Sequence, residues 1–551
     1  MRWLIVALLV VGIAGTAAYT SRLELMLWAA PKLAELRDPV APNREVTWEQ
    51  GPAEANRPPA ERPPNIVLIL ADDMGFNDVS FFNGGAGGGT VLTPNIDAIA
   101  REGVVFTNGY AANAVCAPSR AAIMTGRYST RFGFEFTPFF KIGATIMELM
   151  YEQDPSPLRP IIHHDRLDAL PDMEFLGMPA DEVTMGEVLQ AAGYYTAHIG
   201  KWHLGSVEGM RPEDQGFDNS LYMAGMSYLP EDSPEVVNAK QPFDPIDRMV
   251  WASTRYAAQF DGSHTFEPKG YLTDYYTDEA VRVIEANRHR PFLLYLAHWG
   301  IHNPLQAKRE DYEALAHIDD HRLRVYSAMI LALDRGVGRV LEALEAHGLG
   351  ENTLVIFTSD NGGAGYLGLL DVNAPYRGWK LTHFEGGTHV PFFAKWPARI
   401  EPGSRLEAPV SHIDLFTTIA AAAGAPVPAD RQIDGVDLLP YVGGEAAGEP
   451  HETLFWRQGY LQTVLHDGWK LITSERPTRN WLFHLAADPT EQHDLAEAHP
   501  ERVAELKVLL AEHNASQAEP LWPNVVEAPV LIDKTAAEAY EEGDDYAYWP
   551  N

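Results

Sequence analysis

Residues 65–73 read Asn-Ile-Val-Leu-Ile-Leu-Ala-Asp-Asp, an unbroken apolar run that ends in two aspartates. Such a run is typical of a strand that is buried on both faces of a parallel sheet. Similar runs occupy Phe292 to Ala297 and Leu354 to Thr358, and helical patterns lie between them. The clearest helix is expected from Arg322 to His347, with Gly348 as its C-terminal cap. Strands that alternate with helices predict an α/β domain.

Polar side chains follow each of these predicted strands. Asp72 and Asp73 follow the first, His298 and His302 the second, and Asp360 and Asn361 the third. In open α/β sheets ligands bind beyond the carboxyl ends of the strands, so these groups are expected at one edge. Three aspartates and one asparagine are the oxygen ligands that a hard divalent ion prefers. Each Asp-Asp or Asp-Asn pair alone is more often a turn or helix cap, and the common placement is what favours a metal site.

The composition limits the function. The chain has 551 residues, 46% of them hydrophobic, and a formal net charge of −34. It is long enough for one large and one smaller domain. The acidic balance argues against nucleic-acid binding. An anionic substrate would need a local positive site, made by a metal ion and clustered basic side chains.

The chain divides into four parts by composition. Residues 1–38 open with a basic start and an apolar run from Leu4 to Ala18, and predict a signal peptide or a membrane anchor, with a buried helix of the main domain as a third interpretation. Residues 39–64 are rich in proline and predict an extended, poorly packed linker. Residues 65–445 form the predicted catalytic domain. Residues 446–551 predict a small α+β domain, with strands at 461–465, 469–473 and 481–485, a helix at 500–513, and a tail that is either solvated or packed on the surface.

The single cysteine lies in a distinctive motif. Residues 116–120 read Cys-Ala-Pro-Ser-Arg, and residues 125–127 read Thr-Gly-Arg. This pattern resembles the signature of type I, formylglycine-dependent sulfatases of the arylsulfatase type. The resemblance implies that a formylglycine-generating or sulfatase-maturing enzyme oxidises Cys116, and that Arg120 stabilises the product and the metal-bound charge. It also implies the alkaline-phosphatase-like α/β sandwich, with a large, mixed, mostly parallel sheet.

Three further segments carry the same resemblance. Residues 200–205 (Gly-Lys-Trp-His-Leu-Gly) imply that Lys201 binds sulfate and that His203 contacts the formylglycine hydroxyl. Residues 301–306 imply that His302 contacts the leaving-group oxygen, with His298 as the competing candidate. Residues 377–388 imply Lys380 as the second sulfate-binding lysine; His389 stands where many members carry arginine and is left out of the site.

The resemblance implies a complete enzyme. Calcium, or alternatively Mg²⁺, would be held by Asp72, Asp73, Cys116 as formylglycine, Asp360 and Asn361, whereas transition metals are disfavoured. The reaction would be hydrolysis of a small-molecule or glycan sulfate ester to an alcohol or phenol and inorganic sulfate. The alternatives are a phosphodiesterase or phosphonate hydrolase of the same superfamily, and an inert envelope protein that binds sulfated ligands and in which Cys116 is unmodified.

Substrate and location are the least determined. Phe132, Phe134, Phe136, Phe139 and Phe140 either line an aryl or sterol pocket or form core, and residues 147–178 are expected to be an insertion that shapes the cleft. His163 and His164 within it are unassigned. An exported chain without disulfides favours the bacterial periplasm or a membrane-anchored envelope protein.

Overall fold

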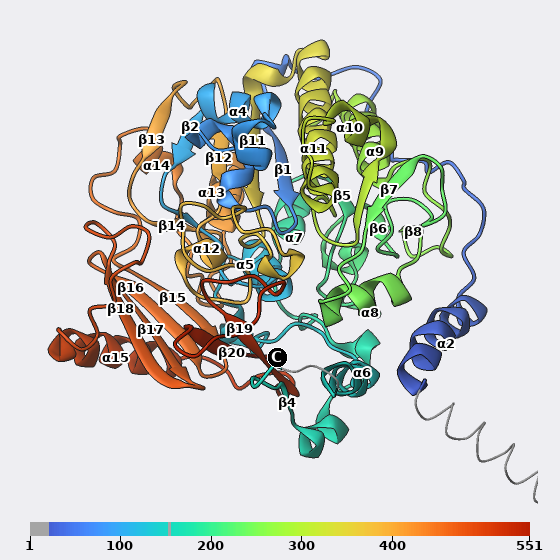
Figure 1. Ribbon diagram of the computed structural model, residues 1–551. Coiled ribbons are helices and arrows are strands. Elements are labelled where there is room, and N and C mark those ends of the chain that lie inside the picture. The colour runs from blue at the N-terminus through green and yellow to red at the C-terminus, as the bar shows by residue number, and fades with distance from the viewer. Residues whose placement is uncertain (1–20, 153–155) are drawn as a thin grey trace, which may run out of the picture.

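The computed structural model describes residues 21–152 and 156–551 (Figure 1). Its centre is a nine-stranded, mixed sheet in the order β13-β2-β12-β11-β1-β9-β5-β6-β8. These strands are β1 (Asn65–Ala71), β2 (Val104–Phe106), β5 (Tyr195–Gly200), β6 (Asn219–Met223), β8 (Ala258–Phe260), β9 (Phe292–Ala297), β11 (Thr353–Ser359), β12 (Phe392–Lys395) and β13 (Ser404–Leu406).

Strand β1 lies at the middle of this sheet and is buried along its whole length. It pairs in parallel with β11, from Asn65 opposite Thr353 to Ala71 opposite Ser359. On its other side it pairs in parallel with β9. The predicted strands are confirmed. The register brings the residues that follow β1 and β11 to the same edge of the sheet.

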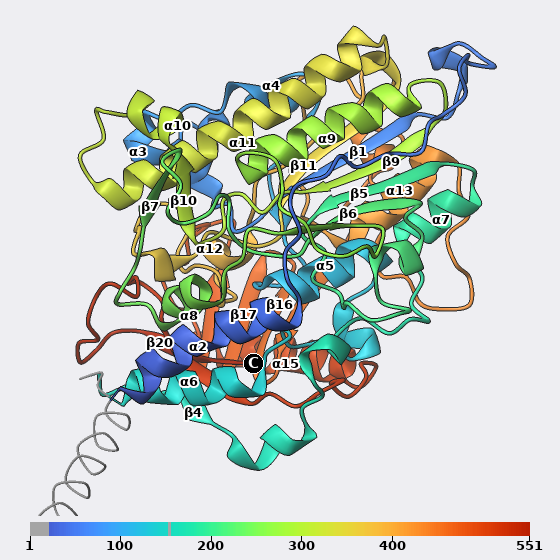
Figure 2. The ribbon, with the colours of Figure 1, turned by 90° about the vertical axis from the view of Figure 1, so that its right-hand side faces the viewer.

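Helices cover both faces of the sheet, as Figures 1 and 2 show. Alternate residues of β1 enter two different cores: Val67 packs with the side chains of α9 and α11, and Leu68 packs with those of α5, α7 and α13. The α/β sandwich is therefore confirmed. These helices are α4 (Pro94–Arg101), α5 (Cys116–Thr125), α7 (Met185–Ala191), α9 (Leu272–Asn287), α11 (His321–Ala346) and α13 (Ile413–Ala423).

Two smaller antiparallel sheets lie at the C-terminal end of the chain. The first contains β15 (Thr453–Gln458), β16 (Leu461–His466), β17 (Trp469–Glu475) and β18 (Thr478–His484), with α15 (Pro500–Asn514) packed on it. The second pairs β19 (Val526–Leu531) with β20 (Tyr546–Pro550) and with β4 (Ile161–Ile162). The end of the tail is thus packed, as β20, whereas residues 541–543 are exposed, and β19 joins the sheet to β4 of the predicted insertion. Strand β15 was not predicted.

One expectation about packing is wrong, and of the two interpretations of the phenylalanine run the core is confirmed for three of its residues. Val46 and Trp48 of the proline-rich segment 39–64 are each 2% exposed, and the Trp48 indole donates to Glu279 of α9 at 2.7 Å. Apolar side chains between the prolines therefore fix this segment to the domain. Phe132, Phe134 and Phe136 belong to the core on the α5 face, so they line no substrate pocket.

The N-terminal part of the described chain is a helix. Residues 1–20, which carry most of the predicted signal or anchor, lie outside the described residues. Helix α2 (Arg22–Arg37) packs against α8 (Pro245–Ser253) and α6 (Lys141–Tyr151). Within residues 21–152 and 156–551, we find no helix with the length and apolar content needed to cross a bilayer.

A buried ionic cluster ties the four-stranded sheet to the central domain. The Lys470 ammonium on β17 lies 2.7 Å from Glu385 and 2.9 Å from Glu491. All three side chains are buried. Burial alone would raise the pKa of Glu385, but Lys470 and His389 lower it to about 2. Burial raises the pKa of Glu491 to about 7. Glu385 opens α12 (Glu385–Thr388), directly after the segment that carries Lys380.

Replacing Lys470 with methionine should destabilise the protein by about 3–5 kcal/mol, because it leaves a carboxylate buried without its partner. Urea unfolding of Lys470→Met checks this. Lys507→Met on the exposed side of α15 is the matched control and should change the stability by less than about 0.5 kcal/mol. Equal stabilities of the two variants would contradict the role of the cluster.

Candidate active site

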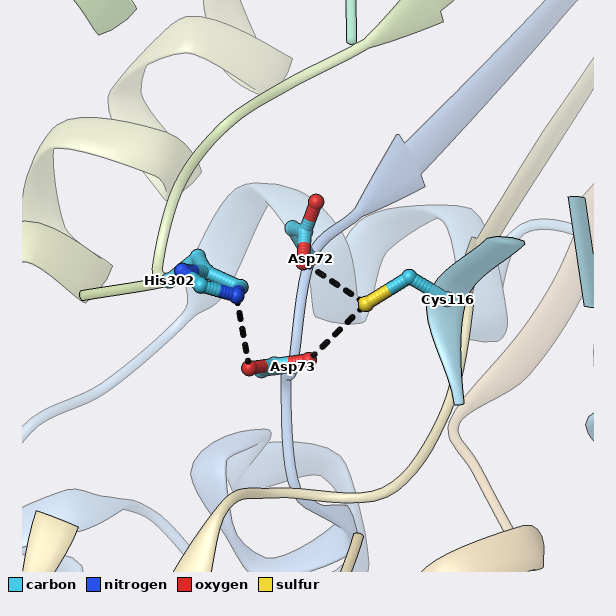
Figure 3. Close-up of side chains that lie close together, drawn as sticks. All are labelled: Asp72, Asp73, Cys116 and His302. Carbon is cyan, nitrogen blue, oxygen red and sulfur yellow. Dashed lines mark hydrogen bonds and ion pairs between the residues drawn. The ribbon is translucent and has the colours of Figure 1, made fainter. Parts of the chain in front are cut away.

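Four predicted site residues meet where the central strands end (Figure 3). The ligand atoms of Asp72, Asp73, Cys116 and His302 all lie within 4.8 Å of one another. Cys116 is the first residue of α5, and its sulfur is 3.7 Å from Asp72 Oδ1 and 3.6 Å from Asp73 Oδ1. All four side chains are buried. The strand ends and the start of α5 therefore form one compact, polar centre.

Arg120 holds the carboxylates in place from one turn further along α5. Its guanidinium contacts Asp72 and Asp360 at 2.8 Å each and donates to the Lys201 carbonyl at 2.8 Å. Arg120 is fully buried, and so are both carboxylates. Burial and the neighbouring Asp360 raise the pKa of Asp72 to about 7, and Lys201 and Arg120 oppose that rise. The arginine thus makes it feasible to bury two like charges side by side.

Two lysines bring positive charge to the same place. Lys380 Nζ lies 2.7 Å from both oxygens of Asp73 and 3.3 Å from the Cys116 sulfur. Lys201 Nζ lies 2.7 Å from Asp72 Oδ2. Burial alone would lower the pKa of Lys380, but Asp73 raises it well above its usual value, so Lys380 is charged. Lys201, Lys380 and Arg120 together balance Asp72, Asp73 and Asp360, so a bound cation would give the positive site that an anionic ligand needs in a chain of net charge −34.

The acidic residues offer a fitting donor set for a hard cation. Asp360 Oδ1 accepts a hydrogen bond from the Asp73 amide at 3.2 Å. The Asn361 side-chain amide donates hydrogen bonds to Asp73 Oδ1 at 2.8 Å and to the Gly362 carbonyl at 2.9 Å. Its Oδ1 is buried and finds no hydrogen-bond partner among the residues that the structure describes. Buried oxygens are normally partnered, so an oxygen-seeking cation such as calcium or magnesium fits here.

The structure separates the two competing histidines. His302 Nδ1 lies 2.6 Å from the Asn303 carbonyl, and Nε2 lies 3.5 Å from Asp73 Oδ2. The carbonyl can only accept a hydrogen bond, so the proton of the neutral ring stays on Nδ1. Nε2 then carries no proton and points toward the cluster. The ring stacks on Trp299 at 4.0 Å between centroids. His298 is fully buried, and within the described part of the chain neither of its ring nitrogens has a hydrogen-bond partner. His302, and not His298, belongs to the cluster.

His203 has an unusual backbone conformation. Its φ of 65° lies in the left-handed region, which turns the chain sharply after Lys201. Its Nδ1 is buried and without a hydrogen-bond partner in residues 21–152 and 156–551. Burial, followed by the charges of Lys201 and Arg120, lowers the pKa of His203 well below its usual value. His203 is therefore a neutral base beside several cations.

Two residues of the site were not predicted. The Tyr366 hydroxyl donates to Asp73 Oδ2 at 2.9 Å and lies 3.2 Å from Lys380 Nζ. The His412 ring bridges Ser119 of α5 and Thr358 of β11, at 3.2 and 3.0 Å. Only the nearness of Tyr366 to the Asp360-Asn361 pair could have marked it, and nothing in the sequence marks His412.

Comparison with known proteins assigns the family. Residues 64–425 match the Sulfatase family, which is more than half of the chain. N-acetylgalactosamine-6-sulfatase of Canis lupus familiaris is 32% identical over 80% of this chain and 83% of its own length. Steryl-sulfatase of Mus musculus is 34% identical over 77% of this chain and 73% of its own length.

A solved structure agrees with these relatives. The crystal structure of Ps i-CgsB in complex with k-i-k-neocarrahexaose is 30% identical, has a TM-score of 0.68, and covers 84% of this chain and 95% of the other. Together with the polar centre at the carboxyl ends of the strands, these similarities show that the chain belongs to the sulfatase family and is a sulfuric ester hydrolase.

Proposed function

We propose that this sulfatase works through a formylglycine made from Cys116 by a maturing enzyme, with calcium, or alternatively magnesium, held beside it. The observation that carries the proposal is the position of Cys116, whose sulfur lies 3.3 Å from Lys380 and 3.6 Å from Asp73. Burial, followed by the charge of Asp360, raises the pKa of the Cys116 thiol. Because the thiolate is the nucleophilic form, an unmodified cysteine would react poorly here.

Each residue of the cluster then has a role that its contacts support. Lys201 and Lys380 hold the sulfate oxygens, and Arg120 balances the carboxylates, so that charge in the transition state is stabilised by groups already in place. Asp72, Asp73, Asp360 and Asn361 would hold the cation, which supplies further positive charge. A hydrated aldehyde at position 116 would supply the attacking hydroxyl and, by re-forming its carbonyl, a route for releasing inorganic sulfate.

Two histidines are assigned to proton transfer. His302 Nε2 faces the cluster without a proton; it would take up a proton from solvent and donate it to the leaving oxygen, with the charged Lys380 as the alternative donor. His203 is neutral, and its Nδ1 would accept a proton from the remaining hydroxyl. The histidines have lowered pKa values through burial, so each is charged only while it holds a proton in transit.

The substrate and the location are also proposals. The relatives include sulfatases named for an amino sugar and for sterols, which supports either a glycan or a small-molecule sulfate ester. A phosphonate monoester hydrolase with 18% identity and a TM-score of 0.56 shares the fold. A panel of sulfate monoesters and phosphate diesters separates these activities. The apolar run from Leu4 to Ala18 supports export to the bacterial envelope, cleaved or anchored.

Cys116→Ala should lower sulfatase turnover at least about 1,000-fold, because both the nucleophile and the route of sulfate release are lost. The far-ultraviolet circular dichroism should not change. Mass spectrometry of the wild-type peptide that contains position 116 should find the aldehyde. A fully active protein with an unmodified cysteine would overturn the proposal.

Removal of divalent ions should lower both the activity and the melting temperature. An ion that binds only the folded state stabilises that state by mass action. The gain is about 2.7 kcal/mol when the free ion concentration is one hundred times the dissociation constant. Titration of calcium into chelated protein, followed by differential scanning calorimetry, checks this. Asn361→Ala should reduce the calcium-dependent shift, whereas Asn514→Ala at the end of α15, where Asn514 contacts Gln462 of the C-terminal sheet, should keep it. A melting temperature that is indifferent to the chelator and to added calcium would contradict the metal assignment.

His302→Ala and Lys201→Ala should differ across aryl sulfates of graded leaving-group acidity. If His302 protonates the leaving oxygen, its loss should matter most for poorly acidic alcohols, by about 100-fold or more. Lys201 binds the sulfate that all substrates share, so its loss should depress kcat/KM for every ester. Equal losses across the series in the His302 variant would exclude the proton-transfer role.

A further inference from the structure

Trp299 is a buried tryptophan in the segment that joins β9 to His302. Its side chain is 3% exposed. The indole Nε1 donates a hydrogen bond to the Met226 carbonyl at 2.9 Å. The Tyr228 hydroxyl lies 2.8 Å from the Trp299 carbonyl and 2.9 Å from the His302 carbonyl. The indole is therefore held at its edge and through its backbone, and Tyr228 fixes the backbone of Trp299 relative to that of His302.

This one indole contacts two residues of the active site. The His302 ring stacks on it with 4.0 Å between the centroids and 24° between the planes. The Lys201 ammonium lies 4.8 Å from the centroid of the same indole. Lys201 follows β5 and His302 lies beyond β9, and these two strands pair in parallel. Trp299 therefore joins two side chains that neighbouring strands deliver to the site.

The orientation of the His302 ring depends on this stack. The ring Nδ1 lies 2.6 Å from the Asn303 carbonyl. One hydrogen bond fixes where that nitrogen lies, but the ring can still turn about it. The indole face removes this freedom, because the two rings keep their full contact only while their planes stay nearly parallel. The stack thus keeps Nε2 directed at Asp73, as Figure 3 shows.

The indole also limits where the Lys201 ammonium can lie. A lysine ammonium has three hydrogens to donate and no acceptor. Asp72 Oδ2 lies 2.7 Å from Lys201 Nζ, and the indole covers another side of the same ammonium at a distance typical of a cation–π contact. The ammonium is therefore held between a carboxylate and an aromatic ring, and its remaining side is available to a sulfate oxygen.

A role in packing alone makes a different prediction from a role in catalysis. Trp299 belongs to the core on the α9 and α11 side of the sheet. Loss of packing lowers the stability and affects the hydrolysis of every ester alike. Loss of orientation at the leaving-group oxygen matters most for esters of poorly acidic alcohols, because those esters depend most on proton transfer.

We propose that Trp299 is a positioning residue of the reaction. Its indole sets the plane of the His302 ring against the leaving-group oxygen, and it holds the Lys201 ammonium toward the sulfate group. The roles of His302 and Lys201 rest on the proposed function, whereas the contacts of the indole do not. Side chains that are locked by their neighbours need no reorganisation when the substrate reacts.

The test compares two substitutions at position 299 with a matched control. Trp299→Leu removes the aromatic face, and Trp299→Phe keeps an aromatic face but loses the hydrogen bond to Met226. Trp396→Leu is the control, because Trp396 is also 3% exposed and its Nε1 also makes one hydrogen bond, to Asn352 at 3.2 Å. Asn352 directly precedes β11 and Asp360 directly follows it, so the control lies at the edge of the sheet opposite to the site.

The measured quantities are kcat and KM for aryl sulfates of graded leaving-group acidity, and the inhibition constant of inorganic sulfate. Trp299→Leu should lower kcat for the least acidic leaving group at least about ten times more than for the most acidic one. It should also raise the inhibition constant of sulfate by about threefold or more. Trp299→Phe should stay within about threefold of the wild type in both quantities. Trp396→Leu should lower the melting temperature and keep the wild-type dependence on the leaving group.

Two kinetic results would overturn the proposal. The first is an equal loss for every ester in Trp299→Leu when His302→Ala shows a graded loss. The second is a Trp299→Phe variant as impaired as Trp299→Leu, because the hydrogen bond to Met226, and not the ring face, would then be responsible. If Trp299→Leu does not fold, Trp299→Met takes its place, since the flexible methionine side chain fills irregular gaps in a core.

A crystal structure of the leucine or methionine variant separates this inference from the proposed function. If His302→Ala loses the same factor for every ester, the proposed proton transfer by His302 is wrong. The crystal structure then decides the inference by itself. A His302 ring turned away from Asp73 supports positioning by Trp299, whereas a His302 ring and a Lys201 ammonium in unchanged places overturn it.

Discussion

The buried contact of Arg120 with Asp72 and Asp360 is the constraint on which the rest of the site depends. Burying a carboxylate without a partner costs several kcal/mol of desolvation free energy, as an order of magnitude. Here two carboxylates lie side by side with no exposure to solvent, and Arg120 contacts both. The arginine can reach both only because β1 and β11 pair in parallel and in register, and because α5 starts at the same edge. The charge balance of the site therefore depends on the strand register and on the position of α5.

The same balance extends outward from the centre. Asp73 is paired with Lys380, and the segment after Lys380 leads to Glu385, which is paired with Lys470 of the four-stranded sheet. Each buried charge in this series has an opposite charge within 2.9 Å. The small C-terminal sheet thus helps to place a lysine that we assign to sulfate binding, although it contributes no side chain to the cluster in Figure 3.

Apolar runs such as residues 65–71 could predict an α/β domain, since such runs are typical of buried parallel strands. The resemblance of the local motifs implied the sandwich, and the same motifs marked Cys116, Lys201, His302 and Lys380. The sequence could not predict His412 or Lys470, whose roles arise from contacts across long stretches of chain. The proline-rich segment 39–64 was misjudged because composition says nothing of the two side chains, Val46 and Trp48, that anchor it.

The electrostatics also bear on how a substrate arrives. A net charge of −34 repels an approaching sulfate ester and Lys201 and Lys380 attract it, and solvent ions at physiological salt screen both effects beyond about 8 Å. Both lysines are buried in the cluster, so their attraction acts once the sulfate group has entered the site and is then weakened little by solvent ions.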